Sequence, residues 1–436
     1  MRIVLARLGA LIGALLVAVA AFVMLARFPL GFWPLAALAL AAFMLAGYAL
    51  LSWVGRTVSA PRASTLRWLL GGTAVYAIAA QLLVGRAPQR TLVAPEPTGE
   101  TQYWTLANGS RIAYEVSRAK GVARPVPVVV LHDGPGMPAL PFYHALGKRP
   151  LDFLGDDGYD VYYYDQLGAG LSGRLDLTRE APYTVARHVE DLEAIRGTLN
   201  VPRMILAGTG WGATLATNYL LQHPDRVEKL ILESPGALWA PAWPELINPA
   251  ARARMTDVQA SALAALQRPP VRLVIGRMMA DFSPRSAHTF IADWEADQWW
   301  TRTTEEAIRL GQPNYTCYSD PGHGIPHPAG LGFFVNSYTL ADAVTHPDPR
   351  PALGKVTTEA LIIRGTCDYT DWPVSAEYLK VLPGARYVAI PAAGHFIWLE
   401  QPGMYADVIR AYLRGESIPL EVYDPTHRRA AGDSAR

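Results

Sequence analysis

The 436-residue chain has little net charge and little cysteine. Its 39 basic and 38 acidic residues leave a formal net charge of +1, which argues against the general basic surface that nucleic-acid-binding proteins present. We therefore expect no nucleic-acid partner. The only two cysteines are Cys317 and Cys367, and the sequence leaves open whether they form a disulfide or remain two buried thiols.

The sequence also lacks a complete set of metal ligands. The nearest approach is the pair His323 and His327 in a stretch rich in proline and glycine. No cysteine or glutamate at a suitable spacing completes a zinc site around them. We therefore expect no metal and no other cofactor.

Charged residues are absent from long runs within residues 1–90. The three uncharged runs are Leu8–Ala26, Phe28–Gly55 and Trp68–Gly85. Because about 20 helical residues cross a hydrocarbon core, the runs predict three transmembrane helices with membrane lipid as their partner. A cleaved signal peptide is the alternative for the first run, and the two runs directly behind it argue against cleavage.

The arginines around these runs predict an orientation. Arg2 and Arg7 precede the first run, and Arg56, Arg62 and Arg67 lie between the second and third. The positive-inside rule then makes the N-terminus cytoplasmic. Three crossings would anchor the protein in the cytoplasmic membrane and place everything after about residue 86 outside the cytoplasm.

Short apolar runs alternate with helical patterns in the rest of the chain. The expected strands are Trp104–Leu106, Arg111–Ser117, Val126–Leu131, Tyr159–Tyr164, Arg203–Ala207, Lys229–Leu232, Ala360–Ile363 and Tyr387–Ile390. The expected helices between them include Val185–Leu199, Ala213–His223 and Val374–Leu382. This alternation predicts an α/β fold with a mostly parallel sheet covered by helices on both faces.

The strand–helix alternation stops between residues 237 and 352, where helix-like sequence predicts a cap inserted over the carboxyl ends of the strands. The expected organisation is a membrane anchor (1–90), a linker (91–103), the first part of the core (104–236), the cap (237–352), the second part of the core (353–415) and a C-terminal tail (416–436).

A serine is missing from the stretch LAGTGWGATLA, residues 206–216. The stretch has the glycine frame of a nucleophile elbow, G-x-S-x-G, but Gly210 stands in the middle position. The elbow is a sharp turn from a strand into a helix, and the context here is that of an elbow. Gly208 and Gly212 supply the small residues that allow the helix to pack closely on the strand.

An acid and a histidine follow the elbow in the order that an α/β-hydrolase triad requires. Asp368 ends one expected strand, and His395 follows the next. Asp368 would orient His395, which would act as general base and acid. Asp371 is a weaker candidate for the acid because it lies farther from the strand end. The alternative for His395 is a hydrogen-bonded core histidine.

Three further stretches resemble motifs of the α/β-hydrolase superfamily, and specifically of the proline iminopeptidases. They are HDGPG at 132–136, similar to H-G-G-P-G; DQLGAGLS at 165–172, similar to D-Q-R-G-x-G-x-S; and WGATL at 211–215, similar to W-G-S-T-L. The resemblance covers about 100–236 and 355–415. The expected anchor is not part of the usual family pattern.

The resemblance implies roles for four residues. Gly134 and Trp211 would supply backbone N–H donors for an oxyanion. Glu295, in a Trp-Glu pair like that of the family, would hold a substrate amine, unless it is a solvated residue beside core tryptophans. Asp133 replaces a glycine of the oxyanion motif, so its carboxylate either joins the substrate site or points outward.

Without a hydroxyl at Gly210, no acyl-enzyme can form by the usual route. Thr209 lies one residue before the tip of the turn, and Asp368 would raise the pKa of the neighbouring Cys367 thiol, so neither is a good substitute. Three hypotheses remain: catalysis by His395–Asp368 without a covalent serine, by hydrolysis or by lyase, cyclase or isomerase chemistry; a catalytically inactive binding module; or a replaced serine in an ordinary hydrolase. The expected substrate is a small peptide, amide or ester, and the oligomeric state stays open.

Overall fold

The computed structural model describes residues 2–28, 30–57, 61–84, 89–179, 181–243, 256–266, 268–309, 316–317 and 329–423. Within it the chain forms two compact units. The first comprises Met1–Thr91, Asp176–Pro182 and Arg268–Ala296, and the second comprises Leu92–Leu175, Tyr183–Gln267 and Asp297–Arg436. The histidines at 323 and 327 lie outside the described residues.

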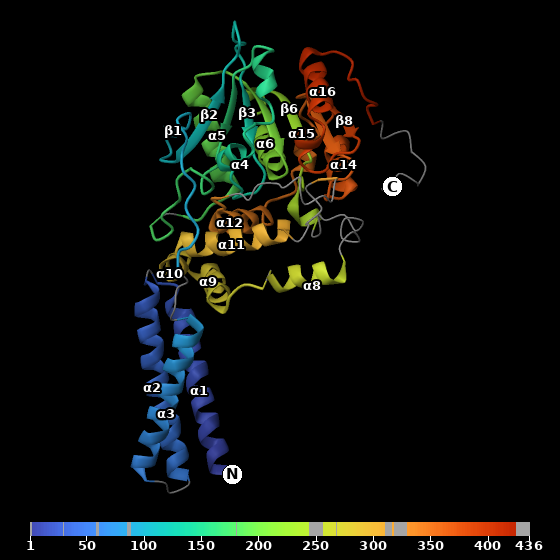
Figure 1. Cartoon of the computed structure of the whole chain (residues 1–436). Coiled ribbons are helices and arrows are strands. Elements are labelled where there is room, and N and C mark those ends of the chain that lie inside the picture. The colour runs from blue at the N-terminus through green and yellow to red at the C-terminus, as the bar shows by residue number, and fades with distance from the viewer. Residues whose placement is uncertain are drawn as a thin grey trace. The chain divides into compact units, whose positions relative to one another are not determined.

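The first unit contains a bundle of three long helices that lie side by side (Figure 1). They are α1 (Arg2–Leu25), α2 (Phe32–Thr57) and α3 (Arg62–Val84). Among the described residues, α1 and α2 are long and apolar enough to cross a membrane, whereas α3 does not meet that criterion. Of the three predicted spans, two are therefore candidates by length and composition, and the third is not. The third run does form a helix, α3, whose mean hydropathy is lower than that of α1 and α2.

Large apolar side chains cover the outer surface of this bundle. Leu16, Leu45 and Leu82 are 65%, 74% and 80% exposed, while small residues such as Ala14 and Ala18 are buried between the helices. This is the reverse of the arrangement in a water-soluble helix bundle.

Two short helices complete the first unit, α9 (Val271–Phe282) and α10 (Pro284–Phe290). Phe290 of α10 stacks on Phe32 of α2 with ring centroids 4.0 Å apart. The N–H of Phe32 donates a hydrogen bond to Thr289 Oγ1 at 3.0 Å, and Ser286 Oγ donates to the Leu30 carbonyl at 2.6 Å. The segment Arg268–Ala296, which the sequence places in the cap, therefore packs with the N-terminal helices.

The second unit is built on one eight-stranded sheet. Its strands are β1 (Gln102–Thr105), β2 (Arg111–Ser117), β3 (Val128–Leu131), β4 (Val161–Tyr164), β5 (Met204–Thr209), β6 (Val227–Glu233), β7 (Ala360–Gly365) and β8 (Ala385–Ile390). The order is β1-β2-β4-β3-β5-β6-β7-β8. The pairs β1–β2 and β2–β4 are antiparallel, and the remaining pairs are parallel. Every expected strand is present, with shifts of up to two residues at its ends.

Helices and short 3₁₀ turns connect these strands (Figure 1). The helices are α4 (Leu140–Leu146), α5 (Val185–Leu199), α6 (Trp211–Gln222), α8 (Asp257–Leu266), α11 (Asp293–Arg309, of which Asp293–Ala296 belong to the first unit), α12 (Phe333–Ala343), α13 (Arg350–Leu353), α14 (Trp372–Val381), α15 (Ile397–Glu400) and α16 (Pro402–Arg414). The 3₁₀ turns are η1 (Asp152–Gly155), η2 (Pro224–Arg226) and η3 (Ala240–Ala242).

The sheet separates two layers of helices, as alternate residues of β5 show. Ile205 and Ala207 belong to a core cluster with side chains of α4, α15 and α16. Gly208 faces the opposite side, where a Cβ on it would lie 2.4 Å from the backbone of Gly212 in α6. Successive strand residues point to opposite faces, so helices cover the sheet on both sides. The predicted α/β architecture is confirmed.

Candidate active site

The predicted elbow is a sharp turn between β5 and α6. Gly210 is the turn residue, with φ +55° and ψ −117°, and α6 begins at Trp211. A positive φ of this kind is strained for residues with a side chain. Close packing explains the flanking glycines, because a Cβ on Gly212 would lie 1.9 Å from the Leu131 carbonyl oxygen. The shape of a nucleophile elbow is thus retained in full.

The acid and the histidine meet at the carboxyl ends of β7 and β8. His395 Nδ1 donates a hydrogen bond to Asp368 Oδ1 at 2.9 Å. The N–H of Thr370 also donates to Asp368 Oδ1, at 3.0 Å. Asp368 and His395 are 2% and 1% exposed. Because a carboxylate only accepts, this bond places a proton on Nδ1 and turns Nε2 away from Asp368.

Asp133 turns its carboxylate into the site. Oδ1 accepts hydrogen bonds from the backbone N–H groups of Gly134, at 2.7 Å, and Trp211, at 2.9 Å. Oδ2 lies 3.4 Å from His395 Nε2. These two N–H groups are the donors that the sequence assigns to an oxyanion, so a carboxylate oxygen of the protein itself takes the oxyanion position.

Asp133 and Gly210 fit each other sterically. A Cβ built on Gly210 would lie 2.0 Å from Asp133 Oδ1 and 2.4 Å from its Cγ. The carboxylate therefore fills the space that a serine side chain at the elbow would need. Of the two placements left open for Asp133, the inward one is observed. Asp133 and Gly210, which both depart from the family pattern, therefore depend on each other sterically.

The two carboxylates control the protonation of His395. Burial alone lowers the pKa of His395, but the negative charge of Asp368 and the contact with Asp133 outweigh burial and raise it to about 10. Burial raises the pKa of each carboxyl, and the interaction with His395 outweighs it, so both pKa values are lowered. At neutral pH the site therefore holds an imidazolium between two carboxylates, with a net charge of −1.

We predict that Asp133→Asn lowers the pKa of His395. Removing an opposite charge within about 4 Å shifts a pKa by about 1–3 pH units. The measurement is a titration of the His395 ring by ¹⁵N NMR in the full chain, and Asp371→Asn is the control because Asp371 caps α14 by accepting from the Trp372 N–H. An unchanged midpoint in Asp133→Asn would show that the carboxylate does not act on the imidazole.

The raised pKa of His395 also makes the free energy of unfolding depend on pH in a definite direction. The pKa of His395 is higher in the folded protein, about 10, than its unperturbed value of 6.5. Its contribution to the free energy of unfolding is therefore complete below about pH 6.5 and is lost as the pH rises to about 10. We expect Tm to fall over this interval, and to fall less in Asp133→Asn.

The DQ motif at 165–166 contacts the HDGPG loop at 132–136. Gln166 donates its backbone N–H to His132 Nε2 at 2.8 Å, and its side chain donates to the His132 carbonyl at 3.0 Å. The indole N–H of Trp211 donates to Gln166 Oε1 at 3.0 Å. The buried Asp165 carboxylate accepts three backbone N–H groups, one of them from Leu171 at 2.7 Å. This motif thus joins the HDGPG loop to α6, a contact that the resemblance to the family motif indicates but does not specify.

Glu233, at the end of β6, is a buried acid that the sequence did not single out. Its carboxylate accepts hydrogen bonds from Thr209 Oγ1, from the Ile397 N–H and from the Tyr405 hydroxyl, at 3.1–3.2 Å. Burial raises the pKa of Glu233 to about 7, although these hydrogen bonds lower it. The contact also fixes the Thr209 hydroxyl below the elbow. The only sequence signal for Glu233 was a charged residue ending an apolar strand.

Glu295, which the resemblance assigns to a substrate amine, lies in α11. It belongs to the first compact unit, where it is 7% exposed. Arg272 Nε donates to its carboxylate at 2.6 Å. The carboxylate of Glu295 is thus paired with the guanidinium of Arg272 in the same unit.

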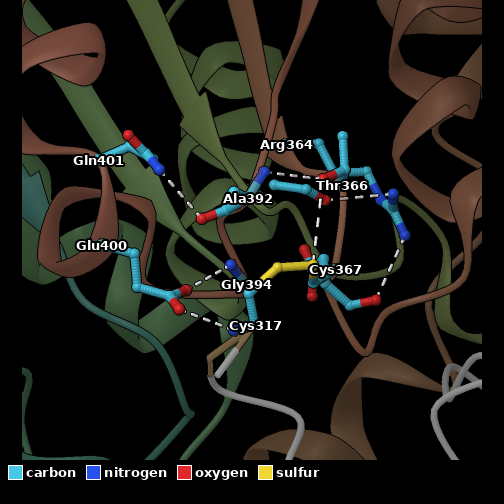
Figure 2. Close-up of a disulfide and its surroundings, with 10 residues drawn as sticks. Cys317, Arg364, Thr366, Cys367, Ala392, Gly394, Glu400 and Gln401 are labelled. Carbon is cyan, nitrogen blue, oxygen red and sulfur yellow. Dashed lines mark hydrogen bonds between the residues drawn. A yellow bond between two sulfur atoms is a disulfide. The ribbon is translucent and has the colours of Figure 1, made fainter. Parts of the chain in front are cut away.

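The two cysteines form a disulfide, with Cα atoms 5.2 Å apart (Figure 2). Beside it, Glu400 accepts from the Cys317 N–H at 2.8 Å and from the Gly394 N–H at 2.6 Å. Cys367 immediately precedes Asp368, and Gly394 immediately precedes His395. The cross-link and Glu400 together hold the two loops that carry the acid and the histidine. Of the two states left open for the cysteines, the disulfide is observed, and it removes Cys367 as a nucleophile.

A cavity of about 510 Å³ opens above the elbow. Asp133, Gly210 and His395 line its floor, and the Asp133 side chain is 18% exposed. Its walls are mainly apolar and aromatic, including Trp239, Trp243, Trp300, Leu238, Leu340 and Tyr369. A cavity of this size and composition accommodates a small, largely apolar molecule with its reactive group toward Asp133 and His395.

Known proteins share this architecture. Residues 126–402 match the family model described as alpha/beta hydrolase fold. The chain is 26% identical over 314 residues to a proline iminopeptidase of Heyndrickxia coagulans, a match that covers 72% of this chain and 98% of the relative. A proline iminopeptidase structure from Mycobacterium smegmatis covers 72% of this chain and 98% of its own, at 20% identity and a TM-score of 0.46. A thermophilic esterase structure from Thermogutta terrifontis covers 73% and 99%, at 19% identity and a TM-score of 0.48.

Proposed function

The chain belongs to the alpha/beta hydrolase fold family, and on that premise we propose that it hydrolyses a small molecule with His395 and Asp368 as its acid–base pair. The observation that carries the proposal is the 2.9 Å hydrogen bond between these side chains, of which His395 lines the cavity. A small peptide, amide or ester is the substrate class that the similarity to proline iminopeptidases favours.

The missing serine sets the chemistry apart from that of an ordinary serine hydrolase. Gly210 offers no hydroxyl, Thr209 donates to Glu233, and Cys367 is in a disulfide. The fit between Asp133 and Gly210 argues against a single replaced residue in an otherwise unchanged serine hydrolase. We therefore expect turnover without labelling by serine-directed probes.

The test is hydrolysis of aminoacyl-arylamide and 4-nitrophenyl ester substrates by the full chain and by His395→Ala. General acid–base catalysis contributes about 10²–10⁴-fold, so we expect at least a 100-fold lower kcat/KM in the variant. The matched control is His223→Ala, because His223 lies at the end of α6 and does not line the cavity. Native activity that survives His395→Ala would contradict the proposal.

A binding module is the second candidate, and one observation favours it. Asp133 already holds both N–H donors that would stabilise an oxyanion. A chain that binds small molecules without turning them over would show a ligand-dependent rise in Tm across the same panel and no product.

We also propose that the N-terminal helices anchor the protein in the cytoplasmic membrane with its second unit outside the cytoplasm. The apolar outer surface of the bundle supports the anchor. The disulfide between Cys317 and Cys367 supports the location, because such bonds persist in oxidising compartments. A cytoplasmic N-terminus then needs an odd number of crossings.

Reporter fusions after residues 60 and 95 test this topology. A periplasm-active reporter should be silent after residue 60 and active after residue 95. The second fusion depends on α3, whose mean hydropathy is below that of α1 and α2. A cytoplasmic signal at residue 95 would overturn the proposed orientation.

A further inference from the structure

The Asp133 carboxylate lies between His395 and the cavity, where it can act on a bound molecule. Its carboxylate fills the space above Gly210, and Oδ2 lies 3.4 Å from His395 Nε2. His395 is in turn oriented by Asp368. Asp133 also faces the cavity, with a side chain nine times as exposed as that of His395, 18% against 2%. Asp133 is therefore placed as a nucleophile, His395 as a base and Asp368 as the acid that orients the base. Asp133 comes from the HDGPG loop at 132–136.

We propose that Asp133 is the nucleophile of this site, that it attacks an electrophilic saturated carbon of the substrate, and that His395 then activates the water that hydrolyses the resulting ester. This inference rests on the proposed hydrolytic function and names its covalent step. The substrate class is a small molecule with a good leaving group on carbon, such as an epoxide, an alkyl halide or an alkyl sulfonate.

The hydrogen bonds of Oδ1 select this carbon over an acyl carbon. Attack on a carbonyl group creates an oxyanion on the substrate, and the Gly134 and Trp211 donors that would stabilise it are already bound to Asp133. Displacement at saturated carbon creates no such oxyanion. In the second step the oxyanion develops on Asp133 Oδ1 itself, which already lies 2.7 Å and 2.9 Å from the two donors.

Both steps balance. In the first, a carboxylate oxygen of Asp133 forms a bond to carbon as the bond to the leaving group breaks; an epoxide oxygen leaves as an alkoxide and takes a proton through solvent. Esterification removes the charge of Asp133, so the His395 imidazolium gives up the equivalent proton to solvent. In the second step, neutral His395 takes a proton from water as the hydroxide adds to Cγ of Asp133. Collapse expels the product alkoxide, which takes that proton from His395, and Asp133 is left as the carboxylic acid. Its ionisation returns one proton, which His395 binds, and the carboxylate–imidazolium pair is restored.

The proposal is tested with 1,2-epoxy-3-(4-nitrophenoxy)propane, an epoxide that reports carboxylate attack as a mass increase. In the full chain with His395→Gln, we expect one adduct per chain, located at Asp133 by peptide mass spectrometry and lost about 100-fold more slowly than from the native protein. Asp133→Asn should form no adduct at this position. Asp371→Asn, a conservative change at the cap of α14, should form it as the native chain does.

Isotope labelling gives a readout that does not depend on a stable adduct. In H₂¹⁸O, repeated turnover of the epoxide should place ¹⁸O in the Asp133 carboxylate of the native chain. Diol formation with no label in Asp133, or an adduct on another residue, would overturn the proposal. If hydrolysis of the arylamide or ester panel requires His395 while the epoxide leaves neither an adduct nor a label on Asp133, the nucleophile assignment fails and the hydrolase proposal stands. If no substrate is turned over and no adduct forms, both fail.

Discussion

The double variant Gly210→Ser/Asp133→Gly is expected to react with a fluorophosphonate probe at least about 10³-fold faster than the native chain. The reason is that the native site keeps every other part of a serine hydrolase: the elbow turn at Gly210, the bond from His395 to Asp368, and two N–H donors. In serine proteases, loss of the serine alone removes most of the catalytic advantage, about 10⁶-fold. Restoring a hydroxyl in that frame should restore a large part of its reactivity.

The single variant Gly210→Ser is expected to react far less. Its Cβ would lie 2.0 Å from Asp133 Oδ1, so one of the two side chains must leave its place. If Asp133 rotates away, its oxygen loses two backbone hydrogen bonds. Asp133→Gly removes the obstruction and frees both donors for the phosphonate oxygen.

The matched control is Gly210→Ala/Asp133→Gly, which introduces the same Cβ without a hydroxyl and should not be labelled. Intact-protein mass spectrometry measures the labelled fraction over time. Equal labelling of Gly210→Ser and the double variant would show that Asp133 does not obstruct the elbow. Labelling of the native chain would show that another residue is the nucleophile of this site.

Local sequence patterns predicted the turn at Gly210 but not that the Asp133 carboxylate fills the space beside it. The glycines at 208, 210 and 212 indicate an elbow because a strand-to-helix turn with a closely packed helix tolerates no larger residue at 208 and 212. The inward position of Asp133 depends on Trp211, 78 residues later in the chain, whose N–H fixes the carboxylate. A rotamer set by such a distant partner leaves no periodic signal in the sequence.

For the predicted cap, too, the sequence indicated the helices but not the elements they pack against. Helical spacing between residues 237 and 352 predicted helices, and the described residues there form α8 to α13. Spacing does not show which elements a helix packs against. The sequence pattern therefore could not predict that Phe290 stacks on Phe32 or that Glu295 pairs with Arg272. These two contacts show that the segment packs with the N-terminal helices and that Glu295 already has a cationic partner.

Reduction of the disulfide is expected to lower the free energy of unfolding by about 4 kcal/mol. Cys317 and Cys367 are separated by 50 residues, and the chain-entropy model assigns a cross-link of that span about this value. The loss should be felt at the site because Cys367 adjoins Asp368 and Glu400 bridges Cys317 to the residue before His395. We therefore expect a lower Tm together with a lower rate of epoxide adduct formation in the reduced chain.

The comparison is made between native chain with and without dithiothreitol and the variant Cys317→Ser/Cys367→Ser, which should be insensitive to the reductant. The variant should unfold like the reduced native chain, because both lack the same constraint on the unfolded state. A reduced chain with an unchanged Tm would contradict a structural role for the bond.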